Sequence, residues 1–174
     1  FGINSAWIQI GSDIDGLTGD FFGMSVAISA DGSIVAIGAT DHDGGKGTTR
    51  IYQNINSTWT QIGSDIDGLD ASEYSGRVSL SSDGSIVAIG ATAHDSHKGT
   101  TRIYQNINST WSKLGLDIDG EFTGDESGYS ISLSSDGSIV AVSTKDHDGD
   151  KGTTRIYKYS IPGQTGGSWI QSGL

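Results

Sequence analysis

The residues best suited to chemistry in this chain are pairs of aspartates in a recurring Asp-Ile-Asp-Gly motif. The three pairs are Asp13 and Asp15, Asp65 and Asp67, and Asp117 and Asp119. Carboxylates at this spacing suit Ca²⁺, which takes about six to eight oxygen ligands and tolerates loop geometry. Aspartate also favours turns without any ion, because its side chain hydrogen-bonds to the nearby backbone. The motif therefore predicts a calcium site in each loop, with simple turn formation as the alternative.

A second set of loops carries histidine next to aspartate. The loops are DHDGGKG (41–47), AHDSHKG (93–99) and DHDGDKG (146–152), with His42, His94 and His147 at matching positions. Zinc or copper would require several imidazoles to converge, and neighbouring residues on one loop seldom do that. We expect solvated polar loops here, and His97, which has no counterpart in the other loops, receives no role.

Tryptophan recurs once per repeat and offers a different kind of site. Trp7, Trp59 and Trp111 are 52 residues apart, and Trp169 follows 58 residues later. Such rings could stack on sugars, which makes a carbohydrate-binding lectin the alternative function for this chain. We favour the simpler interpretation, in which each tryptophan anchors an outer strand and satisfies its N–H at the edge.

Catalysis finds no support in the sequence. Cysteine is absent, no Gly-x-Ser-x-Gly motif occurs, and the paired carboxylates recur in every repeat instead of marking one site. We therefore expect a protein that is not an enzyme.

Charge and surface motifs limit the partners. The formal net charge is −11, with 21 acidic against 10 basic residues, so nucleic acid would be repelled. No apolar run approaches the roughly 18 residues of a membrane helix, and we expect no membrane insertion. Asn56 and Asn108 begin matching Asn-Ser-Thr sequons, which either carry glycans or arise by chance in a Ser/Thr-rich chain. An extracellular or cell-surface protein is the expectation.

The elements that must position these residues are β-strands in a repeat of about 52 residues. Each unit contains an Asp-Gly turn followed by a continuous apolar run, within 30–40, 82–92 and 135–144. An apolar run without polar alternation predicts a strand buried on both faces. Each unit has four antiparallel strands. An alternating strand comes before the apolar strand, a Thr-Thr-Arg-Ile-Tyr strand follows it, and the strand with the tryptophan is last. Repeats of this length and chemistry predict β-propeller blades.

The predicted organisation is three blades and one extra strand. We expect an orphan outer strand and acidic loop in 1–20, and blades in 21–68, 69–120 and 121–174.

The strand sequences resemble the FG-GAP repeat of integrin α-type propellers and of secreted repeat proteins. Phe22-Gly23, Ile37-Gly38-Ala39, and Gly47 with Arg50–Tyr52 carry the resemblance. It implies an extracellular adhesive or scaffold module. The calcium loop of that family is shortened here to Ser-Ala-Asp-Gly or Ser-Ser-Asp-Gly, so calcium does not transfer to Asp31, Asp83 or Asp136.

The number of blades raises the question of assembly. A propeller closes with about four to eight blades, so three blades need either further repeats of a longer chain or self-association. The chain begins within a repeat, which favours a segment of a longer array. The apolar runs at 34–37, 86–89 and 139–142 need a neighbour on both sides, and only the middle blade has two. We therefore expect the outer blades to find cover on another blade.

Overall fold

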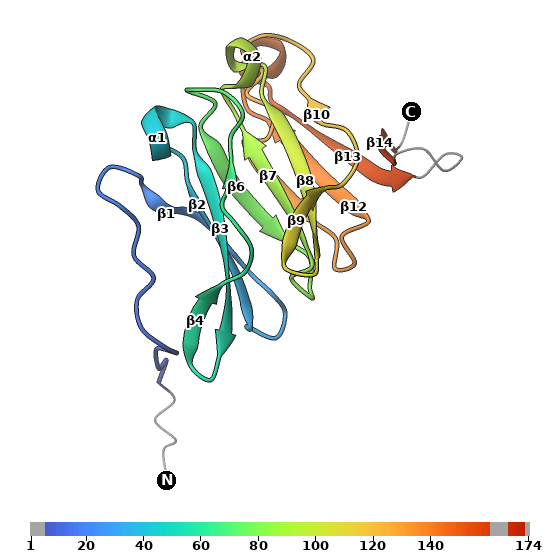
Figure 1. Cartoon of the computed structure of the whole chain (residues 1–174). Coiled ribbons are helices and arrows are strands. Elements are labelled where there is room, and N and C mark those ends of the chain that lie inside the picture. Colours follow the sequence, from blue (N-terminus) through green and yellow to red (C-terminus); the bar gives the residue numbers. More distant parts are fainter. Residues whose placement is uncertain (1–5, 161–166, 173–174) are drawn as a thin grey trace.

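The computed structural model describes residues 6–160 and 167–172 and consists of three antiparallel sheets (Figure 1). The first contains β1 (Phe22–Ile28), β2 (Ile34–Ala39), β3 (Thr48–Ile55), β4 (Thr58–Gln61) and β5 (Ile66–Asp67). The second contains β6 (Ser75–Leu80), β7 (Ile86–Ala91), β8 (Thr100–Ile107), β9 (Thr110–Lys113) and β10 (Ile118–Asp119). The third contains β11 (Ser130–Leu133), β12 (Ile139–Thr144), β13 (Thr153–Ser160) and β14 (Ser168–Gln171). The predicted all-β fold of four-stranded antiparallel blades is confirmed.

The histidine loops connect the second and third strands of each blade. Each contains one short helical turn: α1 (His42–Gly45), α2 (His94–His97) and α3 (His147–Asp150). In the second and third Asp-Ile-Asp-Gly motifs, the second aspartate pairs with the start of a third strand, Asp67 with Thr48 and Asp119 with Thr100. The histidine loops and the Asp-Ile-Asp-Gly loops therefore lie at the same end of the sheets.

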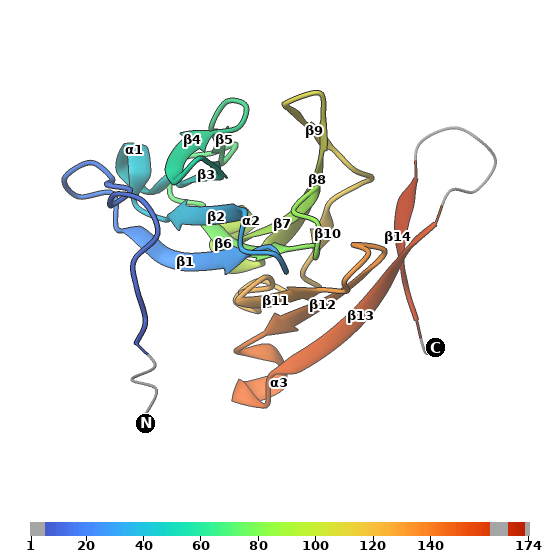
Figure 2. The same ribbon diagram turned by 90° about the horizontal axis from the view of Figure 1, so that it is seen from below.

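The apolar second strand is the centre of each blade, and its burial depends on its neighbours. All six residues of β7 in the middle blade are buried. In β2 the first two residues are only half-buried, and β12 alternates between buried and more exposed positions. Seen from below, the three sheets follow one another as successive blades (Figure 2).

Neighbouring blades touch backbone to backbone at glycine. A Cβ atom on Gly38 would lie 1.7 Å from the carbonyl oxygen of Gly76, and one on Gly90 would lie 2.3 Å from that of Gly128. No side chain fits at either position, so glycine sets the distance between blades. The third blade has Ser143 at this position. A blade covering the third blade would therefore have to lie farther away at this point.

The predicted N-terminal strand is not formed. Residues 6–15 contain no strand, and Trp7 is fully exposed. A fourth strand pairs with the third strand of its own blade, as β4 pairs with β3, and residues 6–15 have no such partner in the described part of the chain. The segment nevertheless contacts the first blade, because Trp59 Nε1 donates a hydrogen bond to the Ile10 carbonyl oxygen at 2.9 Å.

Candidate functional site

The loop end of every blade holds a histidine against a buried carboxylate. His42 Nδ1 lies 3.0 Å from Asp20 Oδ2, and His94 Nδ1 lies 2.6 Å from Glu73 Oε1. In the third blade, His147 Nδ1 lies 3.1 Å from Asp125 Oδ2. These histidines are therefore less solvated than we expected, because each one is half-buried and paired with a carboxylate. His97, which was given no role, lies 3.8 Å from Glu126 Oε1.

In the middle blade this pair extends into a buried network around Glu73. The Glu73 side chain is 1% exposed, and Arg102 donates two hydrogen bonds to it, at 2.7 Å to Oε1 and 3.0 Å to Oε2. The Leu69 N–H donates a third, at 2.7 Å. Burial alone would disfavour the charged carboxylate, but the donors from Arg102 and Leu69 outweigh it and lower the pKa of Glu73. Glu73 therefore stays ionised and holds Arg102 in place.

Asp70 joins Glu73 and His94 to form a candidate metal-binding group. One ligand atom from each of the three side chains lies within 4.8 Å of the others. A carboxylate pair with one imidazole is a ligand set that several divalent ions accept. The bidentate contact of Arg102 with Glu73 already supplies a positive charge at this point, which opposes the binding of a second cation.

The aspartates of the Asp-Ile-Asp-Gly motifs hold side chains of the blade. Asp65 accepts hydrogen bonds from Arg50 Nε at 2.8 Å and from Gln61 Nε2 at 2.7 Å, while Asp67 accepts one from Thr48 Oγ1 at 2.7 Å. Although burial opposes ionisation, the donors from Arg50 and Gln61 lower the pKa of Asp65. These contacts favour the architectural alternative for the motif.

Three of the four aspartates in the other two motifs also contact nearby side chains of the chain. Asp117 pairs with Arg102 at 3.4 Å and with Lys113, and Asp119 accepts a hydrogen bond from Thr100 at 2.7 Å. Asp13 accepts one from Gln9 at 2.8 Å, and Asp15 is exposed. A calcium site at these loops stays a prediction.

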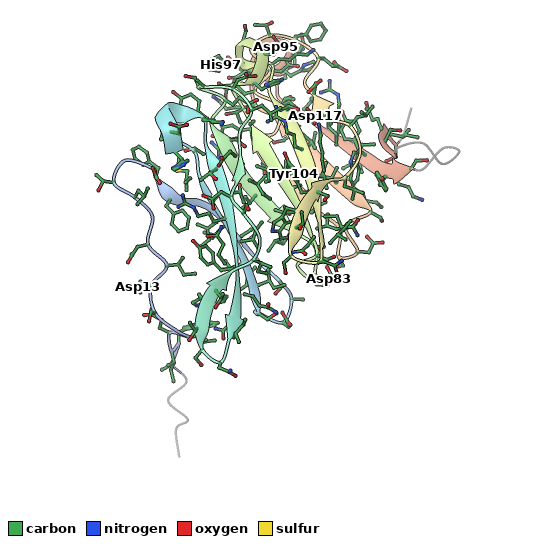
Figure 3. All side chains as sticks on the ribbon, in the orientation of Figure 1. Asp13, Asp83, Asp95, His97, Tyr104 and Asp117 are labelled. Atoms are coloured by element: carbon green, nitrogen blue, oxygen red, sulfur yellow. The ribbon has the colours of Figure 1, made fainter. Side chains whose placement is uncertain are left out.

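The Asp-Gly turns lie at the opposite end of the sheets, where Figure 3 shows Asp83 far from Asp95 and His97. Asp31 accepts hydrogen bonds from the Ser33 N–H and from the Ser29 and Ser33 hydroxyls. The Ser33 N–H and these hydroxyls lower the pKa of Asp31 to about 2. Asp136 has the same contacts with Ser134 and Ser138, and its pKa is also about 2. Serine thus supplies the partners of these carboxylates.

Each tryptophan after the first anchors its strand to the preceding repeat. Like Trp59, Trp111 and Trp169 donate their indole N–H to a backbone carbonyl, that of Ile62 at 2.9 Å and that of Leu114 at 3.1 Å. All three rings are half-buried, so they also keep accessible surface. The anchoring role is therefore present, and the exposed ring surface remains available to a ligand.

Both sequons lie at the tips of β-hairpins. Asn56 and Asn108 are exposed in the two-residue turns between the third and fourth strands, each with φ of 52°. The turns place the two asparagine side chains where a glycan would project into solvent.

The sequence did not reveal the carboxylate partners of the histidines. Asp20, Glu73 and Asp125 precede their histidines by 22, 21 and 22 residues. This recurring separation was a signal available in the sequence, but the two residues lie on different loops that only the folded blade brings together.

Comparison with a family model identifies the repeat. The model for the FG-GAP repeat matches residues 12–52, which run from the first acidic loop to the middle of β3. Residues 12–52 are an FG-GAP repeat. The Thr-Thr-Arg-Ile-Tyr strand of this FG-GAP repeat returns in all three blades, and the Ile-Gly-Ala end of its second strand returns in the second. None of the curated proteins matches the chain.

Solved structures are similar to this chain at low sequence identity. A proposed 6-phosphogluconolactonase from Bacteroides uniformis shares 14% sequence identity at a TM-score of 0.56, over 86% of this chain and 39% of that one. The β-propeller domain of the Trilobed protease from Pyrococcus furiosus shares 16% identity at a TM-score of 0.48, over 77% of this chain and 38% of that one. The chain thus spans about two fifths of the length of these proteins, and the likeness to the first of them shows the fold alone. No helix of the described residues is long and apolar enough to span a membrane.

Proposed function

We propose that this chain is an extracellular, non-enzymatic β-propeller module for structural or adhesive assembly, whose outer blade faces are covered by blades of a second copy. The observation that carries the proposal is a difference between equivalent residues. Val26 and Ile28 in the first blade are 63% and 62% exposed, whereas Val78, the equivalent of Val26 in the middle blade, is 7% exposed. Val26 and Val78 are the same residue type, and Val78 differs in having the first blade packed against it.

The outer face of the third blade shows the complementary difference. Ile156 is 40% exposed, whereas its equivalents Ile51 and Ile103 are 1% and 0% exposed. Within the chain, Ile51 of the first blade and Val78 of the second belong to one hydrophobic cluster. Ile156 of one copy and Val26 of the next therefore match the two sides of an existing blade interface.

Covering these faces would be favourable in energy. Complete burial of a valine or isoleucine side chain contributes about 1.5–3 kcal/mol, and several such residues are exposed on each outer face. Because the two faces differ, the contact would be heterologous, so copies would form a ring or a filament.

The two exposed sequons support the proposal that the protein is extracellular. Asn56 and Asn108 occupy equivalent hairpin tips, and both are exposed.

The test compares self-association of the unmodified chain with that of the double variant Val26→Lys/Ile28→Lys by sedimentation velocity. Because both side chains are exposed in the single chain, the variant is expected to fold normally and to remain at 18.1 kDa while the unmodified chain associates. The control is Ile55→Lys, since the equivalent residue in the middle blade, Ile107, is 53% exposed and takes no part in blade packing. Equal association of the double variant and the unmodified chain would overturn the proposal.

A further inference from the structure

Two equivalent pockets lie at successive repeat boundaries, and the assembly function does not use them. One, of about 360 Å³, lies between the Asp65–Asp67 loop of the first blade and Tyr104 and Trp111 of the second. The other, of about 320 Å³, lies between the Asp13–Asp15 loop and Tyr52 and Trp59 of the first blade. The residues of the two pockets correspond position by position at a separation of 52. Two copies of one pocket indicate a feature built into the repeat.

The aromatic wall of each pocket is fixed in place. The indole N–H of Trp111 is held by the Ile62 carbonyl oxygen, and that of Trp59 by the Ile10 carbonyl oxygen. A Cβ atom at Gly63 would lie 2.9 Å from Trp111 Cδ1, so glycine is needed for this edge of the ring to approach. The half-buried ring therefore has one orientation and exposes apolar surface to the pocket.

The polar side of the larger pocket offers hydrogen-bond acceptors from Asp65 and Asp67, and only Asp65 is paired with a cation. Both oxygens of Asp65 already accept hydrogen bonds, from Gln61 and Arg50, and Arg50 balances its charge. One oxygen of Asp67 is taken by Thr48, which leaves the other as an acceptor. Burial raises the pKa of Tyr104, so its hydroxyl stays protonated and is a neutral polar group.

This combination suits a ligand with hydroxyl groups. An anionic group would be repelled by the aspartates that line both pockets, whereas a hydroxyl group can donate a hydrogen bond to them. A pyranose ring presents an apolar C–H face to an aromatic side chain and hydroxyl donors to carboxylate oxygens. The volumes lie at the low end of the range of about 300–1,000 Å³ for small-molecule sites, which suits one sugar residue.

We propose that each of these two boundary pockets binds one neutral pyranose residue of a glycan. The third boundary differs: Leu116 replaces the serine found at Ser12 and Ser64, and Tyr159 packs on Trp169 with ring centroids 5.2 Å apart. The proposal is independent of self-association, because both pockets lie within a single chain.

The experiment uses saturation-transfer NMR with the methyl glycosides of glucose, galactose, mannose and N-acetylglucosamine as probes. At least one of them is expected to bind with a Kd of about 1 mM. The variant Ser12→Leu/Ser64→Leu introduces the residue that the third repeat carries at this exposed position, and binding is expected to weaken at least about tenfold because the larger side chain crowds the mouth of each pocket. A thermal melt checks that this variant folds.

The matched control is Ser112→Leu, an exposed serine of β9 whose side chain points away from the Trp111 face. It is expected to bind like the unmodified chain. Absence of a signal with all four glycosides, or unchanged binding by Ser12→Leu/Ser64→Leu, would overturn the proposal. Neither result depends on the mass of the protein in solution, so failure of this site and failure of the assembly function are distinguishable.

Discussion

The residue with the most specific environment in this chain is Glu73. Three groups surround its buried carboxylate, the Arg102 guanidinium, the His94 imidazole and the Leu69 N–H. In the other two blades an aspartate takes this position and pairs with the histidine. The glutamate side chain of the middle blade is longer than aspartate. Its carboxylate therefore links its own loop to the histidine loop and to Arg102 of β8, in the one blade that has a neighbour on both faces.

Replacing Glu73 by glutamine is expected to destabilise the fold by about 3 kcal/mol at neutral pH, because the buried Arg102 loses its charged partner. The pKa of Glu73 is lowered on folding. Its ionised carboxylate therefore contributes to the free energy of unfolding above the unfolded-state pKa, near 4.5, and this contribution is lost as the pH falls below that value. Urea unfolding at pH 7 and at pH 3 measures both. The difference between Glu73→Gln and the unmodified chain should shrink at pH 3.

The control for this prediction is Asp65→Asn. Asp65 also pairs with an arginine, but its side chain is 32% exposed, so the loss is expected to stay below about 1 kcal/mol. Equal losses of unfolding free energy for Glu73→Gln and Asp65→Asn would show that the burial of Glu73 does not increase its contribution to stability.

At the scale of elements, glycine decides how closely the blades and loops approach. Gly63, with φ of +74°, lies at the turn where Trp111 of the next blade docks. A Cβ atom there would lie 2.8 Å from the Ser109 carbonyl oxygen and 2.9 Å from the tryptophan ring. The tryptophan anchor and the glycine turn therefore form one contact between repeats.

Gly63→Ala is expected to cost about 2 kcal/mol more than Gly44→Ala in free energy of unfolding. Both glycines have φ near +70°, at +74° and +69°, so the backbone strain of alanine is similar. A Cβ atom on Gly44 meets nothing within 4 Å, which makes it the matched control. Urea denaturation of both variants measures the difference, and similar losses would mean that the tryptophan contact does not require glycine.

Elements could be predicted from the sequence where the signal is local. The apolar runs, the Asp-Gly turns and the 52-residue period gave the strands and the blades. Partners on separate loops could not be predicted, as with Asp20 and His42, because their proximity depends on how the loops fold over the sheet. The strand expected near Trp7 had the right sequence, but a strand also needs a partner for its hydrogen bonds, and sequence alone does not show one.

At the scale of the whole molecule, the three blades form an array with two unequal ends. The first blade exposes Val26 and Ile28, and the third exposes Ile156. Ser143 replaces the glycine that lets neighbouring blades touch within the chain. A second copy would therefore meet an apolar face. The Ser143 side chain would keep this copy farther away than neighbouring blades lie from each other within the chain.

The molar mass in solution tests this account most directly. Sedimentation equilibrium over a range of concentrations is expected to show masses above 18.1 kDa that rise with concentration. Ser143→Gly is expected to associate more tightly, because it restores the close contact seen at Gly38 and Gly90. A mass of 18.1 kDa at every concentration, for both the unmodified chain and Ser143→Gly, would contradict the claim that the outer faces bind blades of a second copy.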